Sequence, residues 1–186
     1  KKAAILLKEG AILAIKGLGG FHLACDATNH DAVTTLRERK RRPNKPFALM
    51  AQDLESVKTF CIFTEEERLL LEESVRPIVI LEKKFPHSIS EAVAPHNKYF
   101  GVMLPYTPLH YLLFSFPELQ FTALVMTSGN LADEPIVTSN QVAMEKLSSL
   151  ADGFLFHNRD IFMRVDDSII RSKRPAVTTR SKSRVS

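Results

Sequence analysis

Residues 16–22 of this 186-residue chain, Lys16-Gly17-Leu18-Gly19-Gly20-Phe21-His22, place a glycine-rich turn between two short apolar segments. Those segments predict strands over residues 11–15 and 21–24. Glycine permits a tight turn and a close approach of main chain to a ligand, so the stretch predicts either a ligand-binding turn or a plain tight turn. It is not a dinucleotide-binding fingerprint, because His22 stands where the third glycine is required. No Gly-Lys-Ser/Thr follows to form a Walker-type loop either.

Helices and strands alternate over much of the remaining chain. Apolar runs predict further strands at residues 47–51, 78–81, 101–104, 122–126, 154–156 and 164–170. Start and stop signals predict helices at residues 2–9, 64–71, 109–114 and 141–150, and one that begins at Asn29 and ends by Pro43. This alternation indicates the α/β class, and strand pairs without a helix between them indicate a mixed sheet.

The composition is that of an ordinary globular domain, with 45% hydrophobic and 25% charged residues. The length, without any repeat or linker, predicts a single domain over residues 1–186. Cys25 and Cys61 are too few for a disulfide framework, and we recognise neither a signal peptide nor a membrane-spanning run. We therefore expect a cytoplasmic protein that does not enter a membrane. The first residue is not Met and the end is rich in Ser, Lys and Arg, so we expect a fragment of a larger protein.

Positive charge gathers in residues 37–46, where six of the ten side chains are basic. The whole chain has a formal net charge of +4, and a basic domain attracts the phosphates of nucleotides or nucleic acids. The helix dipole accounts for some of these cations, and a solvated charged face is the other ordinary explanation. The charges continue, however, into a loop that Pro43 and Pro46 restrict. Cations held at fixed places suit a triphosphate.

Thr127-Ser128-Gly129-Asn130 directly follows a predicted apolar strand. In α/β sheets ligands bind at the carboxyl ends of strands, and hydroxyl, amide and glycine groups there can cradle a phosphate or a carbonyl oxygen. An ordinary turn is the alternative, since these residues favour turns. The Gly-x-Ser-x-Gly pattern of a nucleophile elbow is missing, so we expect no serine nucleophile.

The predicted strand over residues 164–170 carries an unusual polar row. Strict alternation would put Arg164, Asp166 and Ser168 on one face of the sheet, and the intervening residues, Asp167 among them, on the other. Such a row is costly to bury without a ligand or good partners, and an edge strand with a wet face is the alternative. Because Asp166 and Asp167 are expected to diverge, they do not predict a shared metal or an acid/base pair.

Three other polar features give weaker evidence for a functional site. His157-Asn158-Arg159-Asp160 follows a predicted strand and suits either a substrate rim or a loop that binds itself. His22 and Cys25 have a metal-like spacing, but no second pair accompanies them, so we expect no metal ligands. His110 lies among apolar residues, and we expect it to be a satisfied histidine of a helix.

Taken in order, these motifs resemble one family, the YrdC-like domain of HypF-type hydrogenase-maturation carbamoyltransferases. The resemblance covers nearly the whole chain and is carried by residues 16–27, 39–46, 101–105, 108–110, 127–130, 157–161 and 164–168. The glycine turn with Phe21 and His22 separates it from the tRNA-modifying TsaC relatives, which share the basic stretch and a Thr-Ser-x-Asn segment. The resemblance implies a YrdC-like fold, a twisted mixed sheet with flanking helices and a basic concave face.

The resemblance also implies an activity. HypF-type proteins use ATP and carbamoyl phosphate to make a carbamoyl-adenylate, and the carbamoyl group passes to a HypE-type acceptor and becomes cyanide for [NiFe] hydrogenases. We therefore expect ATP with Mg²⁺ as cofactors, and the other domains of the same chain as partners. We expect Lys40, Arg42 and Ser128 to act in catalysis. Nucleotide or phosphate binding is expected of Gly19, Gly20, His22, Lys45, Thr127, Asn130, His157, Asn158, Arg164, Asp166, Ser168 and Arg180.

Besides a purely structural spacer between domains, which would bind no ligand, two other functions remain open at this point. A TsaC-like enzyme would make threonylcarbamoyl-adenylate for tRNA modification, and a module for double-stranded RNA would use the basic cluster for phosphate contacts. Against the second, the cluster is compact and has no interleaved aromatic residues. Residues 180–186 begin like the Arg-rich turn of the family and then depart from it, which bears on the phosphate contact expected of Arg180.

Overall fold

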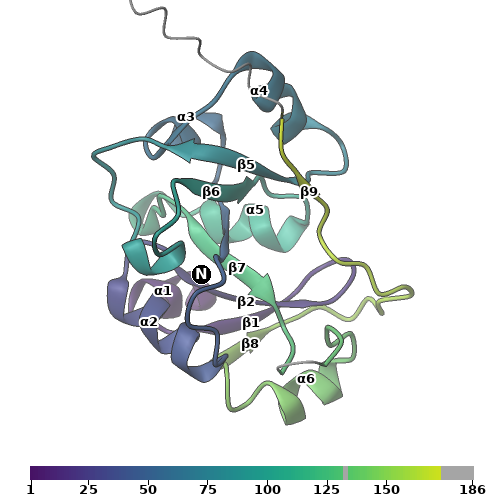
Figure 1. Cartoon of the computed structure of the whole chain (residues 1–186). Coiled ribbons are helices and arrows are strands. Elements are labelled where there is room, and N and C mark those ends of the chain that lie inside the picture. The colour runs from purple at the N-terminus through teal and green to yellow at the C-terminus, as the bar shows by residue number, and fades with distance from the viewer. Residues whose placement is uncertain (132–133, 173–186) are drawn as a thin grey trace, which may run out of the picture.

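The computed structural model describes residues 1–131 and 134–172 of the chain (Figure 1). Within these residues nine strands form one sheet in the order β4-β5-β6-β3-β7-β2-β1-β8, and β9 pairs with β5 away from this path. The strands are β1 Leu13–Lys16, β2 Phe21–Asp26, β3 Ala48–Met50, β4 Cys61–Ile62, β5 Ile78–Lys83, β6 Tyr99–Met103, β7 Leu124–Ser128, β8 Gly153–Leu155 and β9 Ile169–Ile170.

The sheet is mixed, as the sequence predicts. The antiparallel pairs are β1 with β2, β2 with β7, β3 with β7, β4 with β5 and β5 with β6. The parallel pairs are β1 with β8, β3 with β6 and β5 with β9. The expected α/β class with one twisted sheet is therefore confirmed.

Helices cover both faces of this sheet (Figure 1). Leu7 and Leu113, from α1 Lys2–Lys8 and α5 Pro108–Phe114, pack into one apolar cluster with Met126 of β7. The opposite cluster takes side chains from α2 His30–Arg39, α3 Leu54–Lys58, α4 Glu65–Glu72 and α6 Asn140–Lys146. Successive residues of a strand point to opposite faces, and accordingly Val125 belongs to this second cluster. Two short 3₁₀ turns, η1 Glu91–Val93 and η2 Pro117–Leu119, complete the elements.

Local signals in the sequence explain where the helices begin and end. The side chain of Asn29 accepts a hydrogen bond from the amide of Ala32 at the start of α2. Thr64 and Glu67 form the expected capping box of α4. Gly10 follows α1 with φ of +92°, a conformation that favours glycine. No helix in residues 1–131 and 134–172 is long and apolar enough to cross a membrane.

The structure corrects several expected boundaries. The helix that begins at Asn29 ends at Arg39, four residues before Pro43, and α6 ends at Lys146 rather than at residue 150. Residues 164–170 are not one strand, because only Ile169–Ile170 pairs, with β5. The preceding residues leave the sheet plane and run across it, so strict alternation does not apply to them. The short elements α3 and β4 were not predicted, because five and two residues are too few to show a hydrophobic period.

Candidate functional site

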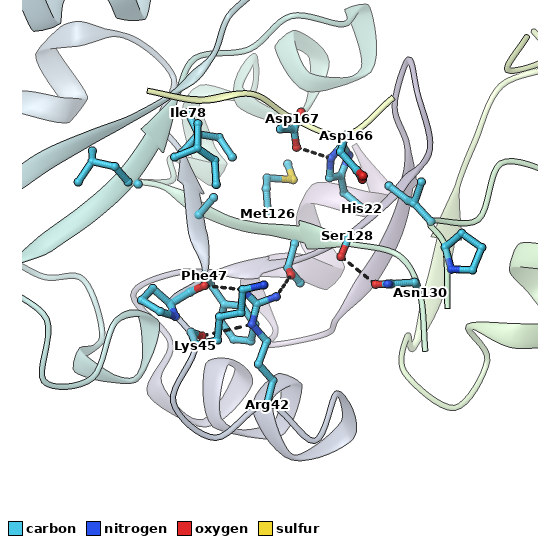
Figure 2. Close-up of a pocket in the computed structure, with 18 of the residues that line it drawn as sticks. His22, Arg42, Lys45, Phe47, Ile78, Met126, Ser128, Asn130, Asp166 and Asp167 are labelled. Carbon is cyan, nitrogen blue, oxygen red and sulfur yellow. Dashed lines mark hydrogen bonds and ion pairs between the residues drawn. The ribbon is translucent and has the colours of Figure 1, made fainter. Parts of the chain in front are cut away.

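A pocket of about 540 Å³ lies over the middle of the sheet (Figure 2). Its floor is a row of register partners on four adjacent strands, running from Ile80 through Gly101 and Ala48 to Met126. The two middle residues are small, so the floor is hollowed between larger apolar side chains. A Cβ atom on Gly101 would lie 2.9 Å from Cγ2 of Ile78, which also lines the pocket. The volume and apolar floor are typical of a small-molecule site.

One end of the pocket is polar. His22 of β2 and Ser128 of β7 are register partners there, and the Ser128 hydroxyl lies 2.8 Å from Oδ1 of Asn130. The roof comes from the strap, which we define as residues 164–170. Asp166 and Asp167 of the strap both line the pocket. The expectation that these two residues lie on opposite faces of a strand is therefore wrong, because they precede the paired residues Ile169–Ile170 and both line one pocket.

Arg42 places a cation on the pocket wall. Its guanidinium donates to Oγ1 of Thr127 at 3.1 Å and to the carbonyl oxygen of Pro46 at 2.6 Å, and lies 5.1 Å from the ring centroid of Phe47. Burial and the neighbouring Arg37 lower the pKa of Arg42. Lys45 also lines the pocket, and within residues 1–131 and 134–172 its side chain has no hydrogen-bond or ion-pair partner. The loop that contains Pro43 and Pro46 can therefore offer two cations to an anionic ligand.

Arg37 holds this loop from beneath. It is 8% exposed and donates to the carbonyl oxygens of five residues, Arg42, Pro43, Lys45, Ala92 and Val93. Its guanidinium lies 4.5 Å from the ring centroid of Phe47. Four of these five hydrogen bonds are partly buried and the one to Val93 is fully buried, so a single charged side chain fixes the loop's shape. Arg37 is a supporting residue that the sequence did not single out.

Lys40 reaches the segment after β7 rather than the open pocket. Its Nζ atom donates to the carbonyl oxygens of Ser128 at 2.7 Å and Asn130 at 3.1 Å, and to Oδ1 of Asn130 at 3.1 Å. Burial and the charge of Arg42 lower the pKa of Lys40 to about 8. Lys40 thus orients the Ser128–Asn130 segment directly, and its charge acts on the pocket from behind that segment.

A buried polar group stands behind His22. Nε2 of His22 lies 3.0 Å from Oδ2 of Asp167, and the hydroxyl of Tyr106 donates to Oδ1 at 3.3 Å. Burial raises the pKa of Asp167, but the hydrogen bonds and charge of His22 and the bond from Tyr106 outweigh it, so the carboxyl has a lowered pKa. His110 packs edge-on against Tyr106, with ring centroids 4.6 Å apart. Burial lowers the pKa of His110 to about 3.

His110 departs from the expected satisfied histidine. Both of its ring nitrogens are buried without a hydrogen-bond partner among the described residues. Asp167 was likewise not expected at the site, because an assumed strand turned it away from its neighbours. Phe47 and Arg37 were missed because their roles depend on contacts between segments, which no local pattern shows.

The glycine turn contacts protein rather than the pocket. A Cβ atom on Gly19 would lie 2.3 Å from the carbonyl oxygen of Val165, and one on Gly20 would lie 2.5 Å from Ile136. The absence of side chains at these positions lets the strap and the segment after Asn130 lie directly on the turn. Gly19 therefore serves close packing against the main chain of Val165, and Gly20 leaves room for the side chain of Ile136. Neither glycine lines the pocket.

The structure brings together seven of the residues expected at the site. The pocket is lined by His22, Arg42, Lys45, Thr127, Ser128, Asn130 and Asp166. His157, Asn158, Arg164 and Ser168 do not line it. The carbonyl oxygen of His157 accepts from Lys16 at 3.3 Å, and that of Ser168 accepts from the amide of Ile78 at 2.8 Å. Arg180 lies outside the described residues.

The arrangement suits a ligand that is flat and apolar at one end and anionic at the other. Ile78, Ile80 and Gly101 provide an apolar surface, and Arg42 and Lys45 provide positive charge next to it. No group of three or more His, Cys, Asp or Glu side chains within residues 1–131 and 134–172 could hold a metal ion. A buried thiol does not contribute either, since burial raises the pKa of Cys25.

Comparisons with known proteins agree with this fold. The family model Sua5/YciO/YrdC, described as telomere recombination, matches residues 5–181. The chain is 50% identical over 183 residues to the carbamoyltransferase HypF of Rhodobacter capsulatus, a match that covers 98% of this chain and 24% of that protein. The chain thus spans about a quarter of the length of this curated relative.

Solved structures give the same result. A full-length HypF in a phosphate- and nucleotide-bound form superposes with a TM-score of 0.87 at 51% identity, covering 91% of this chain and 22% of that one. Sua5 of P. abyssi, complexed with L-threonine, superposes with a TM-score of 0.79 at 19% identity, covering 92% and 50% of the two chains. The second likeness concerns the fold alone. On the family model, the sheet and the two HypF matches together, the chain belongs to the Sua5/YciO/YrdC family as a YrdC-like domain.

Proposed function

We propose that this chain is an ATP-binding adenylation domain that forms carbamoyl-adenylate. The observation that carries the proposal is one pocket that joins an apolar floor to a fixed cationic loop. The floor row from Ile80 to Met126 suits an adenine ring, and Arg42 and Lys45 suit a triphosphate. The likeness to a HypF solved with phosphate and nucleotide supports the same reading.

The proposed reaction requires no covalent nucleophile from the protein. A carboxylate oxygen of carbamate attacks the α-phosphorus of ATP, the bond from that phosphorus to the bridging oxygen breaks, and pyrophosphate leaves with the electron pair. Two anions must approach each other, so the barrier depends on fixed positive charge and hydrogen-bond donors around the α-phosphate. The carbamate would derive from carbamoyl phosphate by hydrolysis, in which water supplies the new carboxylate oxygen and phosphate leaves.

Each polar side chain of the pocket has a proposed role. Arg42 and Lys45 bind the phosphates. The hydroxyl of Ser128, which donates to Oδ1 of Asn130 in this structure, would turn to donate to the α-phosphate or to the carbamoyl oxygen when these bind. Asn130 shares this position, since its Oδ1 lies 2.8 Å from that hydroxyl. Lys40 keeps the Ser128–Asn130 segment in place through its three hydrogen bonds and adds positive charge.

Mg²⁺ would arrive bound to the triphosphate, where it neutralises part of the charge of the leaving pyrophosphate. The remaining steps belong to a longer protein in this proposal. The other domains of a HypF-type chain would supply carbamate, and a HypE-type acceptor would receive the carbamoyl group for cyanide synthesis in hydrogenase maturation. The names of the relatives support a carbamoyl-related role for the domain.

The direct test is ATP–pyrophosphate exchange with ammonium carbamate supplied to the domain. Because carbamate is added as such, the assay does not depend on domains that release it from carbamoyl phosphate. We expect exchange that requires carbamate and falls at least about ten-fold in Arg42→Gln, the loss of one charge-assisted contact. Exchange that requires threonine and bicarbonate instead would contradict the proposal and indicate a TsaC-like enzyme.

RNA binding makes a different prediction about the same cations. Arg37, Lys40 and Arg42 direct their charges onto carbonyl oxygens or into the pocket, which leaves little of the basic cluster to follow a duplex backbone. Steeply salt-dependent binding of double-stranded RNA, without any exchange reaction, would overturn the adenylation proposal.

A further inference from the structure

The strap crosses from one side of the sheet to the other. At its start, the amide of Val165 donates to the carbonyl oxygen of Gly19, in the turn between β1 and β2, at 3.3 Å. At its end, Ile169 pairs with Ile78 of β5, and the amide of Ile78 donates to the Ser168 carbonyl oxygen at 2.8 Å. Strands β6, β3 and β7 lie between these two anchors, and together with Ile80 of β5 they carry the floor of the pocket. The yellow segment that leads to β9 in Figure 1 follows this course.

Between the two main-chain anchors, the side chain of Asp167 ties the strap to β2 and to Tyr106. Its two carboxylate oxygens take different partners: Oδ2 lies 3.0 Å from Nε2 of His22 on β2, and Oδ1 accepts from the hydroxyl of Tyr106 at 3.3 Å. Figure 2 shows Asp167 directed toward His22 while Asp166 lies beside it at the same edge of the pocket. The two partners come from segments 84 residues apart in sequence, so Asp167 joins three parts of the fold.

Neighbouring side chains shield and support the tether, by which we mean the contacts of Asp167 with His22 and Tyr106. The side chain of Asp167 is 26% exposed and that of His22 is 6% exposed, so water competes weakly for their bond. His110, which is fully buried, packs against the rings of both Tyr106 and His22 and limits their movement. By contrast, Val165 and Ile169 are 58% and 68% exposed and add little apolar packing to the strap.

We propose that Asp167, held by His22 and Tyr106, is a positioning residue that fastens the strap over the pocket and thereby sets how long a nucleotide stays bound. The inference rests on the proposed function for its ligand, but the tether itself does not depend on any ligand. With Asp167 fastened, Asp166 and the strap main chain close the roof above the floor of β6, β3 and β7. Without it, the strap keeps only its two end anchors and opens more often.

Two measurements test the tether on the same variants. Hydrogen–deuterium exchange of the amides of residues 165–168 is followed without nucleotide. Dissociation of the fluorescent analogue N-methylanthraniloyl-ATP is followed by stopped flow with Mg²⁺. The variants are Asp167→Ala, Tyr106→Phe and the double variant, and Tyr106→Phe keeps the ring that packs on His110. The control is Tyr111→Phe, which removes the same hydroxyl from a side chain on α5 that is 53% exposed.

We expect faster amide exchange in the strap for both single variants. The control should exchange at the same rate as the unaltered chain. Dissociation should rise about ten-fold in Asp167→Ala and about five-fold in Tyr106→Phe, the effect of losing hydrogen bonds to a charged group. Association should change less than about two-fold, because affinity changes of this kind act mainly on dissociation. Since Tyr106 acts through Asp167, the double variant should match Asp167→Ala alone.

Two results would overturn the inference. Unchanged strap exchange in Asp167→Ala would show that the tether does not hold the strap. Faster exchange with unchanged nucleotide dissociation would show that the strap does not control retention. Failure of the unaltered chain to bind the analogue would refute the proposed function instead, and the exchange data alone would then decide whether Asp167 holds the strap.

Discussion

The Nζ atom of Lys40 lies 2.7 Å from the carbonyl oxygen of Ser128, and this contact joins the end of α2 to the end of β7. A cation in the basic cluster thereby sets the position of the hydroxyl segment. The two sequence motifs that looked like separate phosphate ligands are thus one structural unit. Replacing Lys40 should disturb Ser128 and Asn130 together.

The depressed pKa of Lys40, about 8, predicts a pH dependence of nucleotide binding. A bound triphosphate favours the charged ammonium and raises this pKa, so binding near pH 8 takes up a proton. Affinity should therefore fall as pH rises through about 8. Calorimetry in two buffers of different ionisation enthalpy measures the uptake. Lys40→Arg stays charged at this pH and should abolish it, so equal uptake in that variant would rule out Lys40 as the titrating group.

Arg42 should carry much of the phosphate affinity. Arg42→Gln removes a cation that lines the pocket and should weaken ATP binding at least about ten-fold in calorimetric titration. Arg41→Gln makes the same change in charge at the next residue, which is exposed and does not line the pocket. That control should bind within about two-fold of the unaltered chain, since an exposed charge is largely screened. Equal losses in both variants would mean that net charge, rather than Arg42, attracts the nucleotide.

Gly101 should be required for an open floor. In Gly101→Ala the new Cβ atom would lie 2.9 Å from Cγ2 of Ile78, and the displaced isoleucine enters the pocket. Gly153→Ala creates a similar contact, 3.0 Å from Cδ2 of Leu13, on strand β8 away from the pocket. We expect Gly101→Ala to weaken ATP binding by about five-fold or more, the cost of misplacing one apolar contact, and Gly153→Ala to leave it unchanged. The idea fails if the two variants bind ATP equally well.

Arg37 should matter for stability as well as for the pocket. Arg37→Met keeps the aliphatic stem but removes the Arg37 donor from five carbonyl oxygens. Those of Lys45 and Val93 keep a second donor, from Arg42 and from the amide of Phe47, and the other three do not within the part of the chain that the structure describes. The change should lower the free energy of unfolding by about 3 kcal/mol. That loss corresponds to a fall in Tm of roughly 6–12 °C for a chain of this size. Arg39→Met, on the same helix, loses one carbonyl contact and a half-exposed ion pair with Asp152, and should cost about 1 kcal/mol. Thermal unfolding of the two variants side by side gives the comparison, and a smaller loss in Arg37→Met than in Arg39→Met would contradict this role.

Much of the fold was predictable because local sequence patterns indicate where its helices begin and where its turns lie. The capping box of Thr64 and Glu67 and the N-cap Asn29 placed the starts of two helices correctly, since a cap depends on residues three positions apart. The glycine turn was also found, although its close approach proved to be to Val165 and Ile136 rather than to a ligand. Glycines in a sequence indicate that another group approaches the main chain closely, but they do not show which group it is.

The site was predictable in its polar motifs and not in its geometry. Arg42, Ser128 and Asn130 were expected and line one pocket. The floor was missed because Gly101 and Ala48 become neighbours only through strand pairing. Asp167 was missed because alternation assumes a regular strand, whereas the chain leaves the sheet before Ile169. Contacts between distant segments decide both features.

Titration calorimetry with Mg²⁺-ATP shows whether the pocket over the floor row from Ile80 to Met126 is an ATP site. We expect saturable binding with a stoichiometry of one, weakened at least about ten-fold in Arg42→Gln and changed by less than about two-fold in Arg41→Gln. If no saturable binding is seen at millimolar ATP, or if neither Arg42→Gln nor Gly101→Ala affects the binding, this pocket is not an ATP site.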